Sequence, residues 1–410
     1  MLIWNHKCQK ESKNGGNTSK KDEKMKIIKR YFKDSQNSYF LFGPRGTGKT
    51  TWLKQRFENE LRVDLLEPKA FRLYKARPER LSELIKGNPD KKIVILDEVQ
   101  KIPELLDVVH SLMEDEPKLK FILTGSSARK IKQSGIDLLG GRALVRNLHP
   151  FMASEIKTEF DLTQALQVGL IPLVMSSKEP KETLNAYITL YMKEEVQMEG
   201  LVRNIGNFAR FLEALSFSHG TILNVSNVAR ECEVKRKTVE GYIDVLYDLL
   251  LGFSLPVFTR RAKRAVIKHP KFYFFDTGVF RALRPKGALD QTTEIEGAAL
   301  EGLLAQHLRA WIDYSRSSSK LYYWRTKAGT EVDFIIYGDE CFLAVEVKNT
   351  TNVRRNELKP LKAFRQDYSE CNPVFVYRGS EKLLIDDVWC VPFEDFLKKI
   401  KPNQPLGFPP

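Results

Sequence analysis

A glycine-rich octapeptide near the start of the chain separates an apolar stretch, residues 38–43, from a helical stretch. Glycine lets the backbone turn its N–H groups inward at positions where a side chain would clash. The start of the following helix adds partial positive charge. A strand, this loop and a helix predict a parallel α/β sheet with a phosphate-binding loop at its edge. The loop residues are Gly43, Pro44, Arg45, Gly46, Thr47, Gly48, Lys49 and Thr50.

The segment IVILDE supplies the second half of a nucleotide site. Its four apolar residues indicate a buried strand that ends in two carboxylates, Asp97 and Glu98. We expect Lys49 to contact the β- and γ-phosphates of ATP, and Thr50 and Asp97 to hold Mg²⁺. Glu98 stands where a base would polarise the attacking water. A solvated acidic turn is the alternative for the carboxylates alone, but together with the loop they predict Mg²⁺-dependent ATP hydrolysis.

Apolar runs also predict strands at 62–67 and 119–125. Small polar residues and an arginine follow the second of these. Thr124 and Ser126 are equally suited to sense the γ-phosphate, and a plain turn at the strand end is the alternative. Arg142 follows two glycines and is a candidate to stabilise transition-state charge, in its own site or in that of a neighbour within a homo-oligomer. An ordinary surface arginine fits the sequence equally well.

The order of these motifs resembles the prokaryotic AAA+ ATPases that carry a C-terminal domain of unknown function. The resemblance rests on the loop, LDEVQKIP, LTGSSARK and GGRALVRNLHPFMASEI, and it covers residues 26–400. It implies an α/β fold in which a parallel-sheet AAA+ domain precedes winged-helix-like and restriction-endonuclease-like portions. The expected parts are a disordered basic tail (1–24), the P-loop AAA+ domain (25–155), a helical lid and winged-helix-like region (156–290), a nuclease-like α/β domain (291–400) and a tail (401–410).

The middle of the chain predicts a helix–turn–helix. A short helix capped by Ser226 precedes a turn and a longer helix, 236–251, whose apolar residues recur at three- and four-residue steps. Its first turn carries Arg236 and Lys237, and a recognition helix enters the major groove of DNA by that end. The segment 259–271 follows in the place of a wing.

The net charge of +14 is concentrated in two segments. Residues 1–30 hold nine Lys or Arg against three Asp or Glu, and residues 259–271 hold six Lys or Arg and no acid. Such density attracts nucleic-acid backbones by releasing counterions. We take the first segment as a solubilising tail and the second as a DNA contact, whereas a winged helix used only for packing is the alternative. The candidate DNA contacts are Arg236, Lys237, Arg260, Arg261, Lys263 and Arg264.

The C-terminal part is expected to contain the strands LYYWRT, EVDFII, FLAVEVK and PVFVYR. Acidic residues on two of them suggest a second site. Glu346 and Lys348 are two residues apart on one strand, so their side chains point to the same face. Asp333 on the neighbouring strand is expected to meet them. Two carboxylates hold divalent ions that activate water, and the lysine orients that water. Glu301, on the preceding helix, is a candidate additional ligand. The pattern resembles the PD-(D/E)xK nucleases, while edge strands with solvated charges and a nuclease-like fold without cleavage are the alternatives.

The remaining sequence excludes several classes of protein. No apolar stretch approaches the ~20 residues of a membrane-spanning helix. The five cysteines are scattered, which indicates a reducing, cytoplasmic location without a disulfide framework.

The favoured interpretation is an ATP-dependent DNA-processing enzyme. The alternatives are an ATP-regulated switch that docks DNA or protein without cleavage, and a regulatory ATPase with protein partners only.

Overall fold

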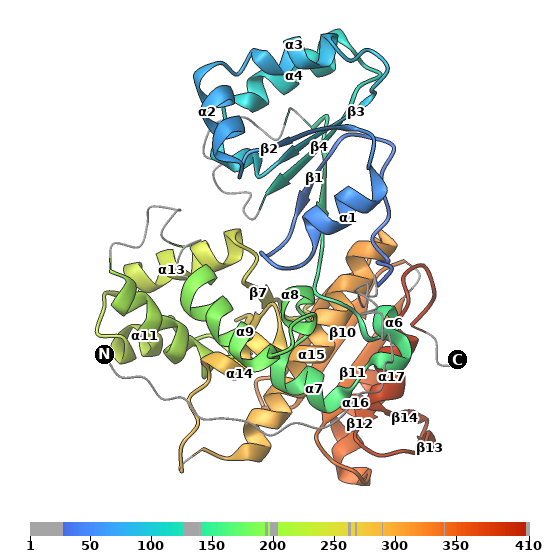
Figure 1. Ribbon diagram of the computed structural model, residues 1–410. Helices are drawn as coiled ribbons and strands as arrows, with labels where there is room; N and C mark the ends of the chain where they lie inside the picture. The colour runs from blue at the N-terminus through green and yellow to red at the C-terminus, as the bar shows by residue number, and fades with distance from the viewer. Residues whose placement is uncertain are drawn as a thin grey trace, which may run out of the picture.

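The computed structural model contains a parallel sheet, a helical middle region and a second, mixed sheet (Figure 1). This mixed α/β architecture confirms the expected fold class. The structure describes residues 28–125, 139, 141–192, 196, 204–260, 264–266, 269–288, 290–339 and 341–406. The predicted tail at residues 1–24 lies outside them.

The N-terminal sheet has the strand order β2-β3-β4-β1-β5, and its neighbouring strands are parallel. The expected strands are present, although each is shorter than its apolar run. β5 was not expected, because its four residues are only half-buried or exposed and carry no apolar run. The elements of this part are β1 (Tyr39–Phe42), α1 (Lys49–Arg56), β2 (Leu61–Asp64), α2 (Pro68–Ala76), α3 (Arg80–Lys86), β3 (Ile93–Asp97), η1 (Val99–Lys101), α4 (Leu105–Asp115), β4 (Lys120–Gly125) and β5 (Leu144–Asn147).

Alternate residues of these strands face two different cores, as the period of a β-strand requires. Phe40 and Leu96 pack with residues of α2, α3 and α4. Tyr39 and Ile95 point to the other face, where they join a core that continues through the helical region into the C-terminal sheet. The N-terminal sheet is therefore packed against the rest of the chain on one face.

The middle region is mainly helical and contains a small sheet of order β6-β8-β7. Its first elements are α6 (Ala153–Ile156), η2 (Lys157–Glu159), α7 (Leu162–Val168), α8 (Pro172–Met175), α9 (Pro180–Ala186) and the π-helix η3 (Tyr187–Met192). The later elements are α11 (Ile205–Ser216), β6 (Thr221–Ile222), α12 (Val225–Glu231), α13 (Arg236–Asp248), β7 (Gly252–Leu255), β8 (Lys271–Phe274) and α14 (Thr277–Leu283).

The predicted helix–turn–helix corresponds to α12 and α13, but its N-cap was assigned to the wrong residue. Ser226 lies inside α12, and Asn224 is the N-cap. The Asn224 side chain accepts a hydrogen bond from the backbone N–H of Asn227 at 3.1 Å. Both residue types are good N-caps, so the sequence did not distinguish them.

The C-terminal sheet has the order β13-β14-β12-β11-β10-β9. β9, β10 and β11 are antiparallel neighbours, whereas β12 is parallel to β11 and to β14. The strands expected from β9 to β12 are present, and β13 and β14 extend the sheet. The elements are α15 (Thr292–Ser315), β9 (Lys320–Arg325), β10 (Glu331–Tyr337), β11 (Phe342–Lys348), η4 (Arg355–Leu358), α16 (Lys359–Asp367), β12 (Asn372–Tyr377), β13 (Leu383–Ile385), β14 (Val388–Pro392) and α17 (Phe393–Lys399).

In the part of the chain that the structure describes, the helices lack the combination of length and apolar character needed to cross a membrane.

Packing of α14 against α7 gives a test of the fold. A Cβ at Gly278 would clash with the backbone of Val168 and Gly169, whereas one at Gly297, also within a helix, would meet nothing within 4 Å. We expect Gly278→Ala to lower the free energy of unfolding by about 2–3 kcal/mol because backbone atoms cannot move aside. Gly297→Ala should be neutral or stabilising by up to ~1 kcal/mol. Denaturant unfolding of both variants would measure this, and equal effects would contradict the packing.

Candidate functional site

The glycine-rich loop connects β1 to α1 in the predicted position. Gly46 and Gly48 have φ angles of 82° and 91°, in the left-handed region that glycine adopts readily. Lys49 is the first residue of α1, and its side chain is buried. Its ammonium donates to the carbonyl oxygen of Gly43 at 2.5 Å. The loop therefore has the backbone form and the buried cation that phosphate binding requires.

Asp97 ends β3 and lies beside three side-chain donors. Its Oδ2 accepts hydrogen bonds from Thr50 Oγ1 at 3.1 Å and from Arg62 Nη2 at 2.5 Å, and its Oδ1 accepts one from Thr124 Oγ1. The Thr50 hydroxyl and the Asp97 carboxylate are thus adjacent, and oxygen donors of these types suit Mg²⁺. These two residues fit the ion that the sequence predicts there.

Arg62 is a site residue that sequence reasoning missed. It lies on β2 and forms an ion pair with Asp97, with 17% and 1% of the two side chains exposed. The signal was weak because an arginine on a short strand is common. Only the pairing of β2 with β3, in which Val63 is opposite Leu96, shows that Arg62 reaches the carboxylate.

Glu98 follows β3 in a left-handed conformation, with φ 61°. Non-glycine residues seldom adopt this conformation, and it is enriched at functional sites. Its backbone N–H donates to Thr124 Oγ1 at 3.0 Å, and its Oε2 accepts from Gln100 Nε2 at 2.6 Å. The structure thus places Thr124 between the two carboxylate residues, while Ser126, the other sensor candidate, lies outside the described residues.

Arg142 lies at the other end of the sheet from the glycine-rich loop. It precedes β5, and the parallel pairing of β5 with β1 puts Asn147, at the far end of β5, beside the strand end that leads into the loop. The Arg142 guanidinium contacts His110 at 2.5 Å and Glu114 at 2.8 Å, both on α4. This placement is incompatible with the predicted role of Arg142 in its own nucleotide site. A role in a neighbouring subunit stays a prediction.

Three carbonyl oxygens of the loop accept hydrogen bonds from outside it. Arg30 Nη1 donates to Thr47 O at 2.9 Å, the Leu173 N–H to Gly46 O at 3.2 Å, and the Tyr187 hydroxyl to Arg45 O at 3.0 Å. The C=O and N–H of a trans peptide point in opposite directions. Each of these bonds therefore fixes the orientation of one loop peptide, including the N–H of the next residue; the Thr47 N–H, which follows Gly46, donates to Pro44 O at 3.3 Å.

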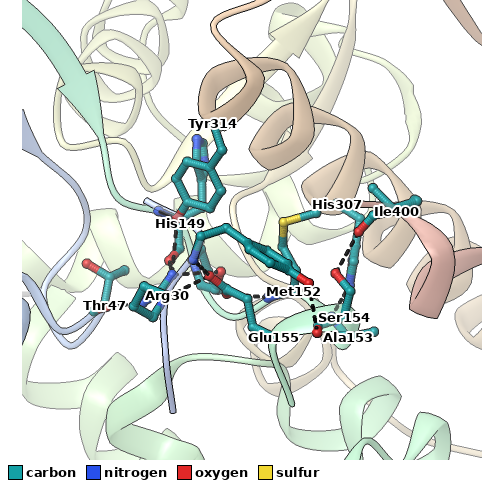
Figure 2. A network of polar contacts seen from close by, with 12 residues as sticks. Arg30, Thr47, His149, Met152, Ala153, Ser154, Glu155, His307, Tyr314 and Ile400 are labelled. Atoms are coloured by element: carbon teal, nitrogen blue, oxygen red, sulfur yellow. Dashed lines mark hydrogen bonds and ion pairs between the residues drawn. The ribbon is translucent and has the colours of Figure 1, made fainter. Parts of the chain in front are cut away.

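Arg30 is the centre of a buried polar network (Figure 2). Besides Thr47, its guanidinium donates to Glu155 Oε1 at 3.2 Å, to His149 O at 2.6 Å and to the Tyr314 hydroxyl at 3.1 Å. Burial by itself lowers the pKa of Arg30, but Glu155 and Tyr314 raise it above its ordinary value. One cation thus joins the nucleotide loop to α15 of the C-terminal part.

The segment 149–156 connects the same region to the C-terminal part through further contacts. His149 Nε2 lies 2.6 Å from Asp313 Oδ2, and the Ala153 N–H donates to His307 Nε2 at 2.9 Å. Ser154 donates to the carbonyl oxygen of Ile400 at 2.6 Å (Figure 2). The segment that follows β5, the strand that ends beside the glycine-rich loop, is therefore hydrogen-bonded to α15 and to Ile400, the residue after α17.

The candidate DNA contacts are placed unevenly. Arg236 and Lys237 are exposed at the start of α13, and Arg236 forms an i,i+4 pair with Glu240 at 2.9 Å. Arg260 and Arg264 are also exposed. Arg261 and Lys263 lie outside the described residues.

The segment after β7 packs against the C-terminal sheet. Val257 and Val266 form isolated bridges with residues of β9 or its end. Arg264 Nε lies 3.1 Å from Asp367 of α16, and the Arg260 guanidinium lies 5.0 Å from the centre of the Tyr337 ring. Both guanidinium groups are therefore already engaged by the C-terminal part, Arg264 by α16 and Arg260 by β10.

Lys271, the last residue of the basic segment, was not among the candidate DNA contacts, and its charge is not available to DNA. Only 3% of Lys271 is exposed, and its ammonium is paired with acidic residues of the C-terminal part. A charge count along the sequence could not distinguish a buried, paired lysine from a solvated one.

The predicted C-terminal site residues do converge. β10 and β11 pair so that Phe334 is opposite Val345, which sets Asp333 beside Glu346 on one face. Asp333 Oδ2 accepts from the Val347 N–H at 2.8 Å, and Lys348 Nζ lies 2.6 Å from Glu346 Oε1. Burial and the Asp333 carboxylate raise the pKa of Glu346 to about 8, although Lys348 opposes this shift.

Three further residues of this cluster were not predicted: Lys271, Tyr273 and Glu331. Lys271 Nζ lies 3.0 Å from Glu301 and 2.6 Å from Glu331, and the Tyr273 hydroxyl donates to Glu301 Oε1 at 2.5 Å. Among the described residues, no group of three or more His, Cys, Asp or Glu side chains is arranged to hold a metal ion. The predicted second metal site is therefore not shown.

Family models divide the chain into three matched segments. Residues 35–157 match an AAA domain, residues 159–290 match the domain of unknown function DUF8612, and residues 296–396 match the domain of unknown function DUF4143. The first match includes the glycine-rich loop, Asp97 and Glu98, and it supports an ATP-binding AAA protein. The other two matches are to domains of unknown function, so they assign no activity to this chain.

Similar proteins have been found in bacteria and archaea. An uncharacterised protein of Mycobacterium tuberculosis is 27% identical over 369 residues, covering 87% of this chain and 80% of the relative. One of Methanocaldococcus jannaschii is 24% identical over 368 residues, covering 76% and 75%. Among solved structures, the replication initiator DnaA bound to AMPPCP and single-stranded DNA matches with 15% identity and a TM-score of 0.24, covering 52% of this chain and 82% of DnaA. That score is too low to support an inference.

The Arg30 network predicts that this residue affects nucleotide affinity. In Arg30→Lys the positive charge remains, but a single ammonium cannot reproduce the fork that serves Thr47, His149 and Glu155. We expect the Kd for ATP to rise about tenfold, the equivalent of one lost charge-assisted hydrogen bond. Fluorescent-nucleotide titration would measure it. The neighbouring exposed Lys29 gives the control Lys29→Met, and a folded Arg30→Lys protein with unchanged Kd would disprove this role.

Proposed function

We propose that this chain binds and hydrolyses ATP with Mg²⁺ at the loop 43–50. The observation that carries the proposal is the convergence of Thr50, Asp97 and Thr124, with Glu98 next to them. Thr50 and Asp97 would hold Mg²⁺, which when bound would neutralise negative charge that develops on the phosphates. The match of residues 35–157 to an AAA domain supports the same proposal.

Each residue has a distinct part in the proposed reaction. The loop N–H groups and the Lys49 ammonium bind the phosphates, and Thr50 and Asp97 hold the ion. Glu98 accepts the proton of the attacking water, with Gln100 orienting its carboxylate. Thr124 holds the backbone of Glu98 in its left-handed conformation through the bond to the Glu98 N–H. In a homo-oligomer, Arg142 of a neighbouring subunit is the candidate that would stabilise transition-state charge.

The nucleotide state would be communicated to the rest of the chain through Arg30. This residue bonds both the loop, at Thr47, and α15, at Tyr314. A change in the loop that accompanies phosphate binding would therefore alter the position of the guanidinium between these two partners. This connection supports an ATP-controlled rearrangement of the C-terminal part.

DNA binding is a second proposal, and it rests on the middle region. The order α11, β6, α12, α13, β7, β8 is that of a winged helix, and α13 presents exposed Arg236 and Lys237 at its start. These supply charge where a recognition helix meets DNA. Val257 and Val266, in the place of the wing, form bridges with Tyr323 of β9 and with Thr326 just after it, so α13 is the stronger candidate contact.

Cleavage of DNA is the less favoured form of the proposal. The order α15, β9, β10, β11, α16, β12 and the convergence of Asp333, Glu346 and Lys348 support a nuclease-like fold. Lys271, however, stands among the carboxylates that would bind an activating ion. We therefore favour the alternative in which the C-terminal part docks DNA or protein without cutting it.

Two substitutions separate nucleotide binding from hydrolysis. Lys49→Ala should lose ATP binding, because the cation opposite the phosphates is removed. Glu98→Gln should retain binding and lower the hydrolysis rate by about 10²-fold or more, because the amide cannot accept the proton. Nucleotide titration and phosphate release would be measured on both. Glu104→Gln, at the start of α4, is a matched control, and a Glu98→Gln protein with normal turnover would overturn the assignment of the base.

The DNA-binding proposal predicts a strong effect at the start of α13. Replacing Arg236 and Lys237 with Gln should weaken binding to duplex DNA more than tenfold and reduce the slope of log K against log salt concentration by about 2. Fluorescence anisotropy across a salt series would measure this. The control with the same charge change is Lys69→Gln with Arg72→Gln, exposed on α2. Equal affinities of the two double variants would remove α13 as a DNA contact.

A further inference from the structure

Lys271 is a buried cation supplied by the middle region to acids of the C-terminal part. It begins β8, and its ammonium lies 2.6 Å from Glu331 Oε1, 3.0 Å from Glu301 Oε1 and 3.8 Å from Asp333 Oδ1. A buried ammonium without partners would be strongly unfavourable. These carboxylates therefore stabilise it, and it neutralises them in return.

The cluster is connected to β8 by a second side chain. Tyr273 lies two residues after Lys271, so both side chains project from the same face of the strand. Its hydroxyl donates to the same Glu301 oxygen that Lys271 contacts. Two adjacent donors of one strand thus converge on a carboxylate of α15.

We propose that the Lys271 ammonium is the resident cation of this carboxylate cluster, in place of a divalent metal ion. The cluster is then an ionic joint that fixes β8 to α15 and β10. While β8 is packed in this position and Lys271 is paired with these acids, the cluster holds no hydrolytic metal ion.

The other contacts of the acids agree with this assignment. Asp333 Oδ2 accepts from a backbone N–H, Glu346 Oε1 faces Lys348, and Glu331 Oε2 lies 3.1 Å from Arg325 Nη1. A divalent ion needs several oxygen ligands at about 2.0–2.6 Å from one point. Protein donors and cations already contact these oxygens, whereas Glu346 Oε2 is buried without a hydrogen-bond partner. One free oxygen is fewer than a divalent ion requires, and an ammonium among the acids would repel the ion.

Binding of Mn²⁺ to nucleotide-free protein tests the proposal. The full chain carrying Asp97→Asn removes the ion expected at the nucleotide site, so the result does not depend on the proposed ATPase activity. We expect no Mn²⁺ bound at the C-terminal cluster by electron paramagnetic resonance. Adding Lys271→Met should create a site for one Mn²⁺ that binds at least ~100-fold more tightly, because the acids lose their cation. The control Lys327→Met, in the exposed turn between β9 and β10, should create none.

Thermal unfolding gives a second readout. Mn²⁺ should raise the Tm of Lys271→Met and leave that of the parent protein unchanged. Without Mn²⁺, Lys271→Met should have a lower Tm than the parent protein, because the carboxylates lose their cation. Adding Glu301→Gln should recover most of this decrease, because it reduces the excess negative charge. Failure to recover it would contradict the proposal.

Two outcomes of the binding experiment would also overturn the proposal. One is tight Mn²⁺ binding by the parent protein that Glu346→Gln abolishes, which would show a metal site despite Lys271. The other is a folded Lys271→Met protein that gains no Mn²⁺, which would show that the ammonium does not take the place of an ion.

Discussion

The ion pair between Arg30 and Glu155 is the interaction on which the arrangement of this chain depends. Both side chains are almost completely buried, at 7% and 0% exposed. Removing one partner from such a pair costs about 3–5 kcal/mol, because the other charge is left unpaired. The pair holds the segment before β1 against the segment after β5, and the same guanidinium bonds the glycine-rich loop and α15.

The nucleotide loop is consequently shaped by two sets of residues. Its own glycines permit the required backbone conformation, while Arg30, Leu173 and Tyr187 hold its carbonyl groups from outside. The outer set comes from segments that local motifs do not include. The C-terminal cluster follows the same principle, since Lys271 belongs to the middle region but pairs with acids of α15 and β10.

The sequence predicted what depends on local pattern. Apolar runs predicted most strands of both sheets, and the loop with Asp97 identified residues that the structure brings together. It did not predict Arg62, Arg30 or the position of Arg142, because these depend on which strands pair and which surfaces meet. Lys271 was not identified for a related reason: a lysine in a basic segment has the same sequence whether it faces solvent or a buried carboxylate.

One core extends from the parallel sheet through the helical region into the C-terminal sheet, including Tyr39, Phe208 and Phe334. Boundaries between family matches therefore do not mark places where the chain divides into independent units. A chimaera that takes its AAA part from one relative and its C-terminal part from another would have to carry over both sides of the shared surface. Arg30, residues 149–156 and α15 would be inherited together or replaced together.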